Sequence, residues 1–121
     1  MSDEPQISAA EWEVMKVLWD HSPITVNDLC RRMESLKQRH PKTIRTMLIR
    51  LSKKGVVDTK VEDGIYHYFP TVSREECSRA EADSFLEKVF DGALAPMVAH
   101  FVKRRRLTAE ERRELKKLLE R

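Results

Sequence analysis

Residues 42–54 carry the side chains whose types and spacing point most directly to a chemical role. At about 100° per residue, the period of an α-helix, they divide into an apolar side and a polar side. Lysine and arginine bind phosphate groups, while arginine, threonine and methyl-bearing side chains can read the edges of bases. The segment has no carboxylate, whereas an ordinary solvated helix face mixes both charges. Nucleic-acid binding is therefore favoured over the alternative, a basic and merely solvated surface helix. The apolar side consists of Ile44, Met47, Leu48 and Leu51, and the polar side of Lys42, Thr46, Ile49 and Lys53, flanked by Arg45 and Arg50.

The charges are sorted along the chain although the formal net charge is only +3. Residues 1–30 hold one cation and six acids, whereas residues 31–54 hold nine cations and one acid. Such a layout helps to dock one face on a phosphate backbone. A further basic run at residues 103–106 either contacts DNA or forms a solvated linker.

Catalytic and metal-binding patterns are missing from the sequence. The four histidines are scattered, there is no glycine-rich phosphate loop, and no serine or zinc protease motif occurs. Cys30 and Cys77 stand apart, which favours small buried or half-buried thiols over a disulfide or a metal pair. We therefore expect no enzyme activity, no cofactor and no bound metal.

The length of 121 residues fits one domain, or a small domain with an extension. No apolar run approaches the ~20 residues of a membrane span, and the first residues do not resemble a signal peptide. The isolated cysteines agree with a reducing compartment. These features predict a cytoplasmic protein that does not contact a membrane.

The elements expected around residues 42–54 have the order of a winged helix-turn-helix. Ser8 and Glu11 form a capping box ahead of a first helix, whose two tryptophans we assign to the core. A short strand at residues 24–26 and a second helix capped by Thr25 follow, and the third helix ends at Gly55. Residues 56–61 and 65–69 then alternate with period two around an Asp-Gly turn, which predicts a hairpin. In this arrangement the third helix enters the major groove, and the hairpin, or wing, lies beside it.

After Pro70 the sequence predicts three amphipathic helices, two of them opened by capping boxes at Ser73 and Thr108. Residues 73–121 are too few to bury much apolar surface among themselves. A second copy of the chain is the simplest partner for their apolar stripes. The alternative is that they pack back onto the head. We thus expect a mainly α fold with a winged-helix DNA-binding domain at residues 1–72 and a helical dimerisation domain at residues 73–121. The residues assigned to the dimer are Phe85, Leu86, Val89, Leu94, Met97, Val98, Leu115, Leu118 and Leu119.

Four parts of the chain carry a family resemblance: the opening Ile7–Trp19, the Lys-Thr-Ile-Arg-Thr segment at 42–46, Arg50-Leu51 and the wing tyrosines at 66 and 68. Together they resemble the penicillinase-repressor (BlaI/MecI) family. The resemblance runs from about residue 7 to the end of the chain. It implies a homodimeric repressor that binds double-stranded DNA at inverted repeats with TACA/TGTA-type half-sites in β-lactam-resistance operons. It also implies release when a sensor-linked protease cuts before a phenylalanine, here between His100 and Phe101. Well-known members have asparagine where this chain has His100, and no cysteine after Cys77 could form the copper-sensing cluster of a sister branch.

The predicted DNA contacts divide into base reading by Thr43, Arg45, Thr46 and Arg50, phosphate binding by Lys42, Lys53 and Lys54, and a wing contact by Lys60. A threonine methyl or Ile49 can lie against a thymine methyl. Two other readings stay open. One is a winged-helix adaptor that binds protein, and the other is a repressor released by a small ligand. If Phe101 is only a core residue, the segment around it is never cut.

Overall fold

The computed structural model describes residues 6–37 and 40–121 and divides the chain into two compact units, residues 1–79 and 80–121. The boundary lies inside the fourth helix, α4 (Arg74–Phe90), whereas the sequence places it before that helix begins. We call residues 1–79 the head and residues 80–121 the tail. No helix among the described residues is long and apolar enough to span a membrane.

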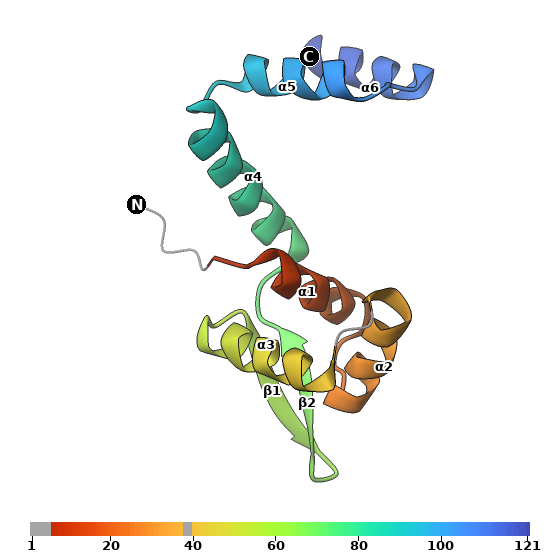
Figure 1. The fold of residues 1–121 in the computed structure, drawn as a ribbon, viewed down its shortest axis with the longest axis vertical. Coiled ribbons are helices and arrows are strands. Elements are labelled where there is room, and N and C mark those ends of the chain that lie inside the picture. The colour runs from red at the N-terminus through yellow and green to blue at the C-terminus, as the bar shows by residue number, and fades with distance from the viewer. Residues whose placement is uncertain (1–5, 38–39) are drawn as a thin grey trace. The chain divides into compact units, whose positions relative to one another are not determined.

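Three helices build most of the head, in the order that the sequence predicts (Figure 1). They are α1 (Ala9–His21), α2 (Val26–Lys37) and α3 (Pro41–Lys53). The Ser8–Glu11 capping box at the start of α1 is confirmed, with both backbone-to-side-chain bonds formed at 2.9 and 3.1 Å. Thr25 caps α2 by accepting a hydrogen bond from the Asp28 backbone N–H at 3.2 Å. These caps satisfy backbone donors that the first helical turn leaves free.

The wing is an antiparallel hairpin of β1 (Val57–Glu62) and β2 (Ile65–Pro70). Asp63 and Gly64 join the strands with φ of 53° and 75°. A two-residue turn with positive φ at both positions matches the twist of the strands, which is why Asp-Gly predicts it correctly. The short strand expected at residues 24–26 is reduced to Ile24, which pairs with Tyr68 by hydrogen bonds of 2.8 and 3.0 Å. Val26 already belongs to α2.

The apolar core lies in the head, where α1, α2, α3 and the start of the hairpin meet. Each of the helices contributes a buried stripe, and Val56 and Val57 extend the core toward the wing. Trp12 and Trp19 are only half-buried, so their assignment to the core is partly wrong. Their rings pack 5.5 Å apart, and the Trp19 indole N–H donates to the Val72 carbonyl at 2.9 Å. An amphipathic indole at the core's edge can keep such a polar contact.

The tail comprises the rest of α4 with α5 (Leu94–Arg104) and α6 (Ala109–Leu119), as the stripes predict. The corner between α4 and α5 is closed by hydrogen bonds from the Gly92 N–H to Leu86 and from the Ala93 N–H to Phe90. Gly92 has a φ of 80°, which a residue with a Cβ rarely adopts. None of α4, α5 and α6, all fully described, contains a buried residue.

Candidate nucleic-acid interface

Helix α3 is anchored by its apolar side, which turns its polar side outward. Ile44, Met47, Leu48 and Leu51 are each at most 3 % exposed, as the helical period predicts. The helix begins at Pro41, and the His40 side chain caps it by accepting a hydrogen bond from the Lys42 N–H on Nδ1 at 3.1 Å. Proline suits this first position because its missing N–H would have no partner there.

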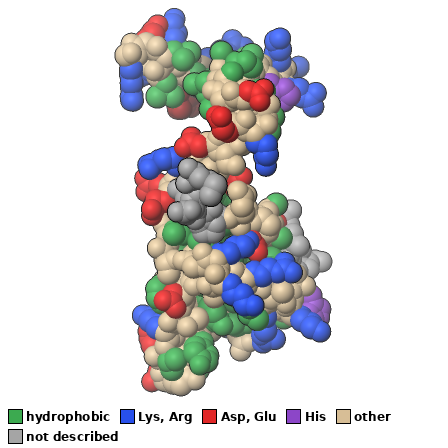
Figure 2. All heavy atoms as spheres, turned by 90° about the vertical axis from the view of Figure 1, so that its left-hand side faces the viewer, with side chains coloured by type: hydrophobic (Ala, Val, Ile, Leu, Met, Phe, Trp, Pro, Cys, Tyr) green, Lys and Arg blue, Asp and Glu red, His purple; other side chains and the backbone are tan. Residues whose placement is uncertain are grey.

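The structure brings six of the eight predicted DNA-binding residues, together with Ile49, onto one helix surface. We call this outward side of α3 the basic face. It has no acidic residue in its first turn and has Arg50 and Lys53 in its last, where cations interact favourably with the helix dipole. Figure 2 shows lysine and arginine side chains grouped on one side of the head. The basic face consists of the exposed residues Lys42, Thr43, Arg45, Thr46, Ile49, Arg50 and Lys53.

Thr46 on the basic face has its hydroxyl engaged within the helix. The hydroxyl donates to the Lys42 carbonyl four residues earlier, at 3.0 Å. Back-bonding of this kind is a common way for threonine to satisfy its hydroxyl in a helix. The hydroxyl proton is thus engaged at the backbone, so a base contact of Thr46 would use its methyl group or the hydroxyl oxygen as an acceptor.

Lys54, for which the sequence predicts a phosphate contact, forms an ion pair within the head. Its Nζ lies 2.6 Å from Oε1 of Glu11, whose side chain is only 3 % exposed. Burial alone would raise the pKa of the Glu11 carboxyl, but hydrogen bonds from Lys54 and from the Ser8 backbone lower that pKa below its ordinary value of 4.5. Because the pair joins the start of α1 to the end of α3, we leave Lys54 out of the proposed DNA contacts.

Lys60 stands on β1 of the wing and pairs with Glu62 of the same strand at 3.0 Å. The hydrogen bond and charge of Lys60 lower the pKa of the Glu62 carboxyl. Both side chains are about half exposed, and ion pairs in such positions contribute little to stability. The pair can therefore open at small cost if a phosphate group approaches Lys60.

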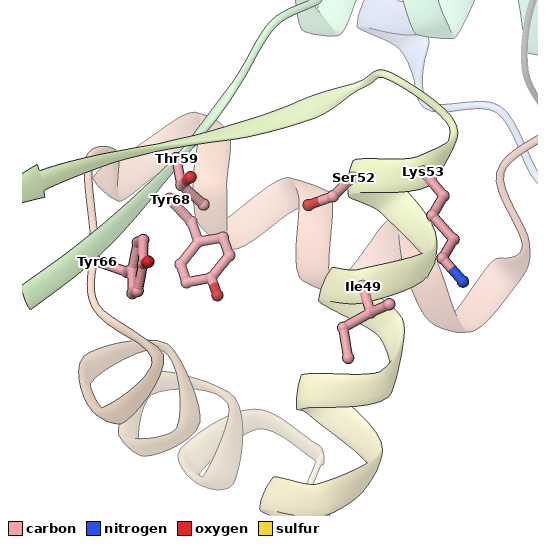
Figure 3. A pocket seen from close by; sticks show the side chains of 6 residues that line it. All are labelled: Ile49, Ser52, Lys53, Thr59, Tyr66 and Tyr68. Carbon is pink, nitrogen blue, oxygen red and sulfur yellow. The ribbon is translucent and has the colours of Figure 1, made fainter.

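A groove separates the last turns of α3 from the wing (Figure 3). One side is formed by Ile49, Ser52 and Lys53, and the other by residues of β1 and β2. Four of these residues, Ser52 and the three from the wing, are not among the site residues that the sequence predicts. The alternation of Tyr66, His67 and Tyr68 places both tyrosines on the same strand face, which is the signal that could have found them. The wing residues that line the groove are Thr59, Tyr66 and Tyr68.

The tail keeps large hydrophobic side chains at its surface (Figure 2). Leu86 and Met97 are half-buried, and the other seven residues predicted to form the dimer are between 36 and 83 % exposed. Exposed large hydrophobic side chains that gather in one region are typical of a surface used for binding. The exposed members are Phe85, Val89, Leu94, Val98, Leu115, Leu118 and Leu119.

The predicted cleavage residues lie in α5 within a group of aromatic rings. The ring centroids of His100 and Phe101 are 5.2 Å apart, and Phe101 also lies 6.4 Å from Phe85 of α4. His100 lies 6.1 Å from Phe90. Phe101 is 42 % exposed in the single chain. A second copy of the tail could cover it, so cleavage at this bond stays a prediction beside the alternative that Phe101 is only a core residue.

A family model described as the penicillinase repressor matches residues 7–121. The chain belongs to the penicillinase repressor family. A penicillinase repressor of Bacillus licheniformis is 39 % identical over 120 residues, which cover 99 % of this chain and 94 % of the relative. The methicillin resistance regulatory protein MecI of Staphylococcus aureus strain N315 is 34 % identical over 114 residues, covering 94 % and 93 %.

Solved structures of related repressors agree with this membership in the penicillinase repressor family. The solution structure of the DNA-binding domain of BlaI matches with a TM-score of 0.55 and 42 % identity, covering 63 % of this chain and 93 % of that chain. The monomeric form of B. licheniformis BlaI in complex with the blaP half-operator matches equally well. The S. aureus MepR–DNA complex, at 22 % identity and a TM-score of 0.51, supports the winged-helix fold alone.

Proposed function

We propose that this chain, a DNA-binding transcriptional repressor by its family, acts as a homodimer on an inverted-repeat operator. In each half-site α3 enters the major groove and the wing lies beside it. The observation that carries the proposal is the basic face, a helix surface with four cations, two threonines, one isoleucine and no carboxylate. A protein-binding adaptor would be expected to have an apolar or acid-balanced third helix instead.

The basic face supports a division of labour among its residues. Thr43, Arg45, Thr46 and Arg50 face the base edges, while Lys42 and Lys53 bind phosphates and Lys60 reaches the backbone from the wing. An arginine can hold guanine by two hydrogen bonds, which a lysine or threonine cannot reproduce. TACA/TGTA-type half-sites, which the family resemblance of the sequence implies, are part of this proposal. So are genes of the β-lactam-resistance type, which agree with the names of the relatives.

The second part of the proposal is that the tail makes the dimer. Its support is the exposed apolar surface of α4, α5 and α6, which a second copy of the tail would cover. An isologous dimer has two-fold symmetry, so its operator must be pseudo-palindromic, with half-sites one turn of DNA apart or a multiple of that.

The third part of the proposal concerns release from DNA. A sensor-linked protease would cut between His100 and Phe101 and detach α6 together with the end of α5. The dimer would lose apolar contacts worth about 1.5–3 kcal/mol for each fully buried large side chain, while the head stayed intact. Mass spectrometry of the protein in its native host after exposure to a β-lactam tests this step. An intact chain while the operon is switched on would show that another mechanism operates.

Arg45→Ala is expected to weaken operator binding by about 1–3 kcal/mol and to relax base preference at one position of each half-site. Lys53→Ala should weaken binding to all sequences about equally, because a phosphate contact carries no sequence information. Gel-shift titrations against the inverted-repeat promoter fragment and single-base variants of it measure both effects. If both variants lose affinity and neither changes its base preference relative to the wild type, the roles of Arg45 and Lys53 are wrongly assigned. Failure of the wild-type chain to shift the fragment would favour the adaptor.

A further inference from the structure

One large apolar side chain stands among the polar groups of the basic face. Ile49 is 57 % exposed, and its neighbours within one helical turn include Arg45, Thr46, Arg50 and Lys53. Ile49 belongs neither to the buried core cluster nor to the half-buried residues packed against it. Its exposure therefore does not serve the folding of the head.

The groove beside α3 gives Ile49 a specific setting. Ile49 lies across this groove from the wing tyrosines, as Figure 3 shows, and Tyr66 is 61 % exposed. Lys53 lines the same groove, one turn after Ile49. An apolar surface bounded by cations on a face without carboxylates is complementary to a DNA strand, which combines phosphate charge with apolar sugar and methyl groups.

The chemical groups that bases present in the major groove limit what Ile49 can contact favourably. Guanine, cytosine and adenine present hydrogen-bond donors and acceptors there, which an isoleucine cannot satisfy. Thymine also presents a 5-methyl group, whose burial against an apolar side chain is favourable. We propose that Ile49 is a specificity-determining residue that packs against the 5-methyl group of one thymine in each half-site. This inference rests on the proposed function and extends it to one named contact.

Thr46 offers a second methyl group on the basic face and must be distinguished from Ile49. Its hydroxyl bonds to the Lys42 carbonyl, which fixes the rotamer and with it the direction of the methyl group. Thr46→Ser removes that methyl and keeps the hydroxyl, so it tests the alternative reader. Ile65→Ala serves as the matched control, because Ile65 is 53 % exposed on the wing but does not line the groove.

The experiment replaces single thymines of the operator by uracil, which removes only the 5-methyl group. Fluorescence anisotropy of the full-length chain on each duplex gives the dissociation constant. At one thymine position in each half-site, we expect uracil to weaken wild-type binding about fourfold per methyl, the equivalent of about 0.8 kcal/mol. Ile49→Ala should bind the thymine duplex more weakly and lose this discrimination, whereas Thr46→Ser and Ile65→Ala should retain it.

Three results would overturn the inference. The first is wild-type binding that is insensitive to uracil at every position, and the second is an unchanged uracil penalty in Ile49→Ala. In both, the duplex is still bound, so the proposed function survives. The third is loss of the penalty in Thr46→Ser alone, which would assign the methyl contact to Thr46. Absence of any binding by the wild-type chain would reject the proposed function and the inference together.

Discussion

Val98→Asp is expected to convert the proposed dimer to a monomer and to lower affinity for the full operator by about 10²- to 10⁴-fold. Val98 lies on the apolar stripe of α5 and is 39 % exposed in the single chain. Burying a carboxylate without a partner between two copies has a large desolvation cost, so the substitution should prevent the two copies from associating. Without the dimer the two heads bind independently, and the second half-site is no longer held at a high effective concentration.

Ala99→Asp is the matched control for this variant. Ala99 is the next residue of α5, is exposed, and lies off the stripe formed by Leu94, Val98 and Phe101. It should remain dimeric and bind the operator like the wild type. Light scattering gives the oligomeric state, and anisotropy on operator and half-site duplexes gives the affinities. A Val98→Asp chain that stays dimeric would place the interface elsewhere.

Lys54→Met should destabilise the head by about 2–3 kcal/mol, because it leaves the buried Glu11 carboxylate without its cation. Loss of one partner from a fully buried pair costs about 3–5 kcal/mol, and Lys54 retains partial contact with water. Replacing both partners, in Glu11→Gln with Lys54→Met, should recover part of the loss because no charge is left buried. Urea unfolding followed by circular dichroism measures these differences.

The adjacent lysine provides the control for Lys54. Lys53→Met should leave the free energy of unfolding within about 0.5 kcal/mol of the wild type, since Lys53 is exposed. It should instead reduce the magnitude of the slope of log K against log salt by about 2, because each of the two subunits loses one phosphate contact. Lys54→Met should leave that slope unchanged. If Lys54→Met instead changed the salt slope and Lys53→Met did not, Lys54 would contact phosphate and Lys53 would not.

The same pair sets an expectation for pH. The pKa of Glu11 is lower in the folded head than its ordinary value of 4.5, so the folded state favours the ionised carboxylate. Its stabilisation is complete above pH 4.5 and is lost as the pH falls through the folded-state pKa. Unfolding curves of Glu11→Gln should therefore fall less steeply with acid than those of the wild type.

Local patterns explain why most of the fold could be predicted. A capping box such as Ser8–Glu11 acts over three residues, and the Asp63-Gly64 turn over two, so each can be recognised without tertiary information. The basic face likewise follows from the helical period, because burial of one side of α3 dictates the exposure of the other.

The parts that could not be predicted depend on contacts between distant residues. Glu11 and Lys54 are 43 positions apart, and nothing in the composition of residues 53–54 indicates which lysine turns inward. The bond from Trp19 to Val72 spans 53 positions and ties the segment after the wing to α1. The groove beside Ile49 exists only once the hairpin of β1 and β2 lies beside α3.

The dependence of operator affinity on salt shows whether the basic faces of two copies bind the phosphate backbone around the bases that they read. Each neutralised phosphate releases counterions, so log K falls linearly with log salt. If the dimer makes about eight phosphate contacts, anisotropy titrations of the full-length chain on its operator should give a slope near −7. A flat response would contradict the account.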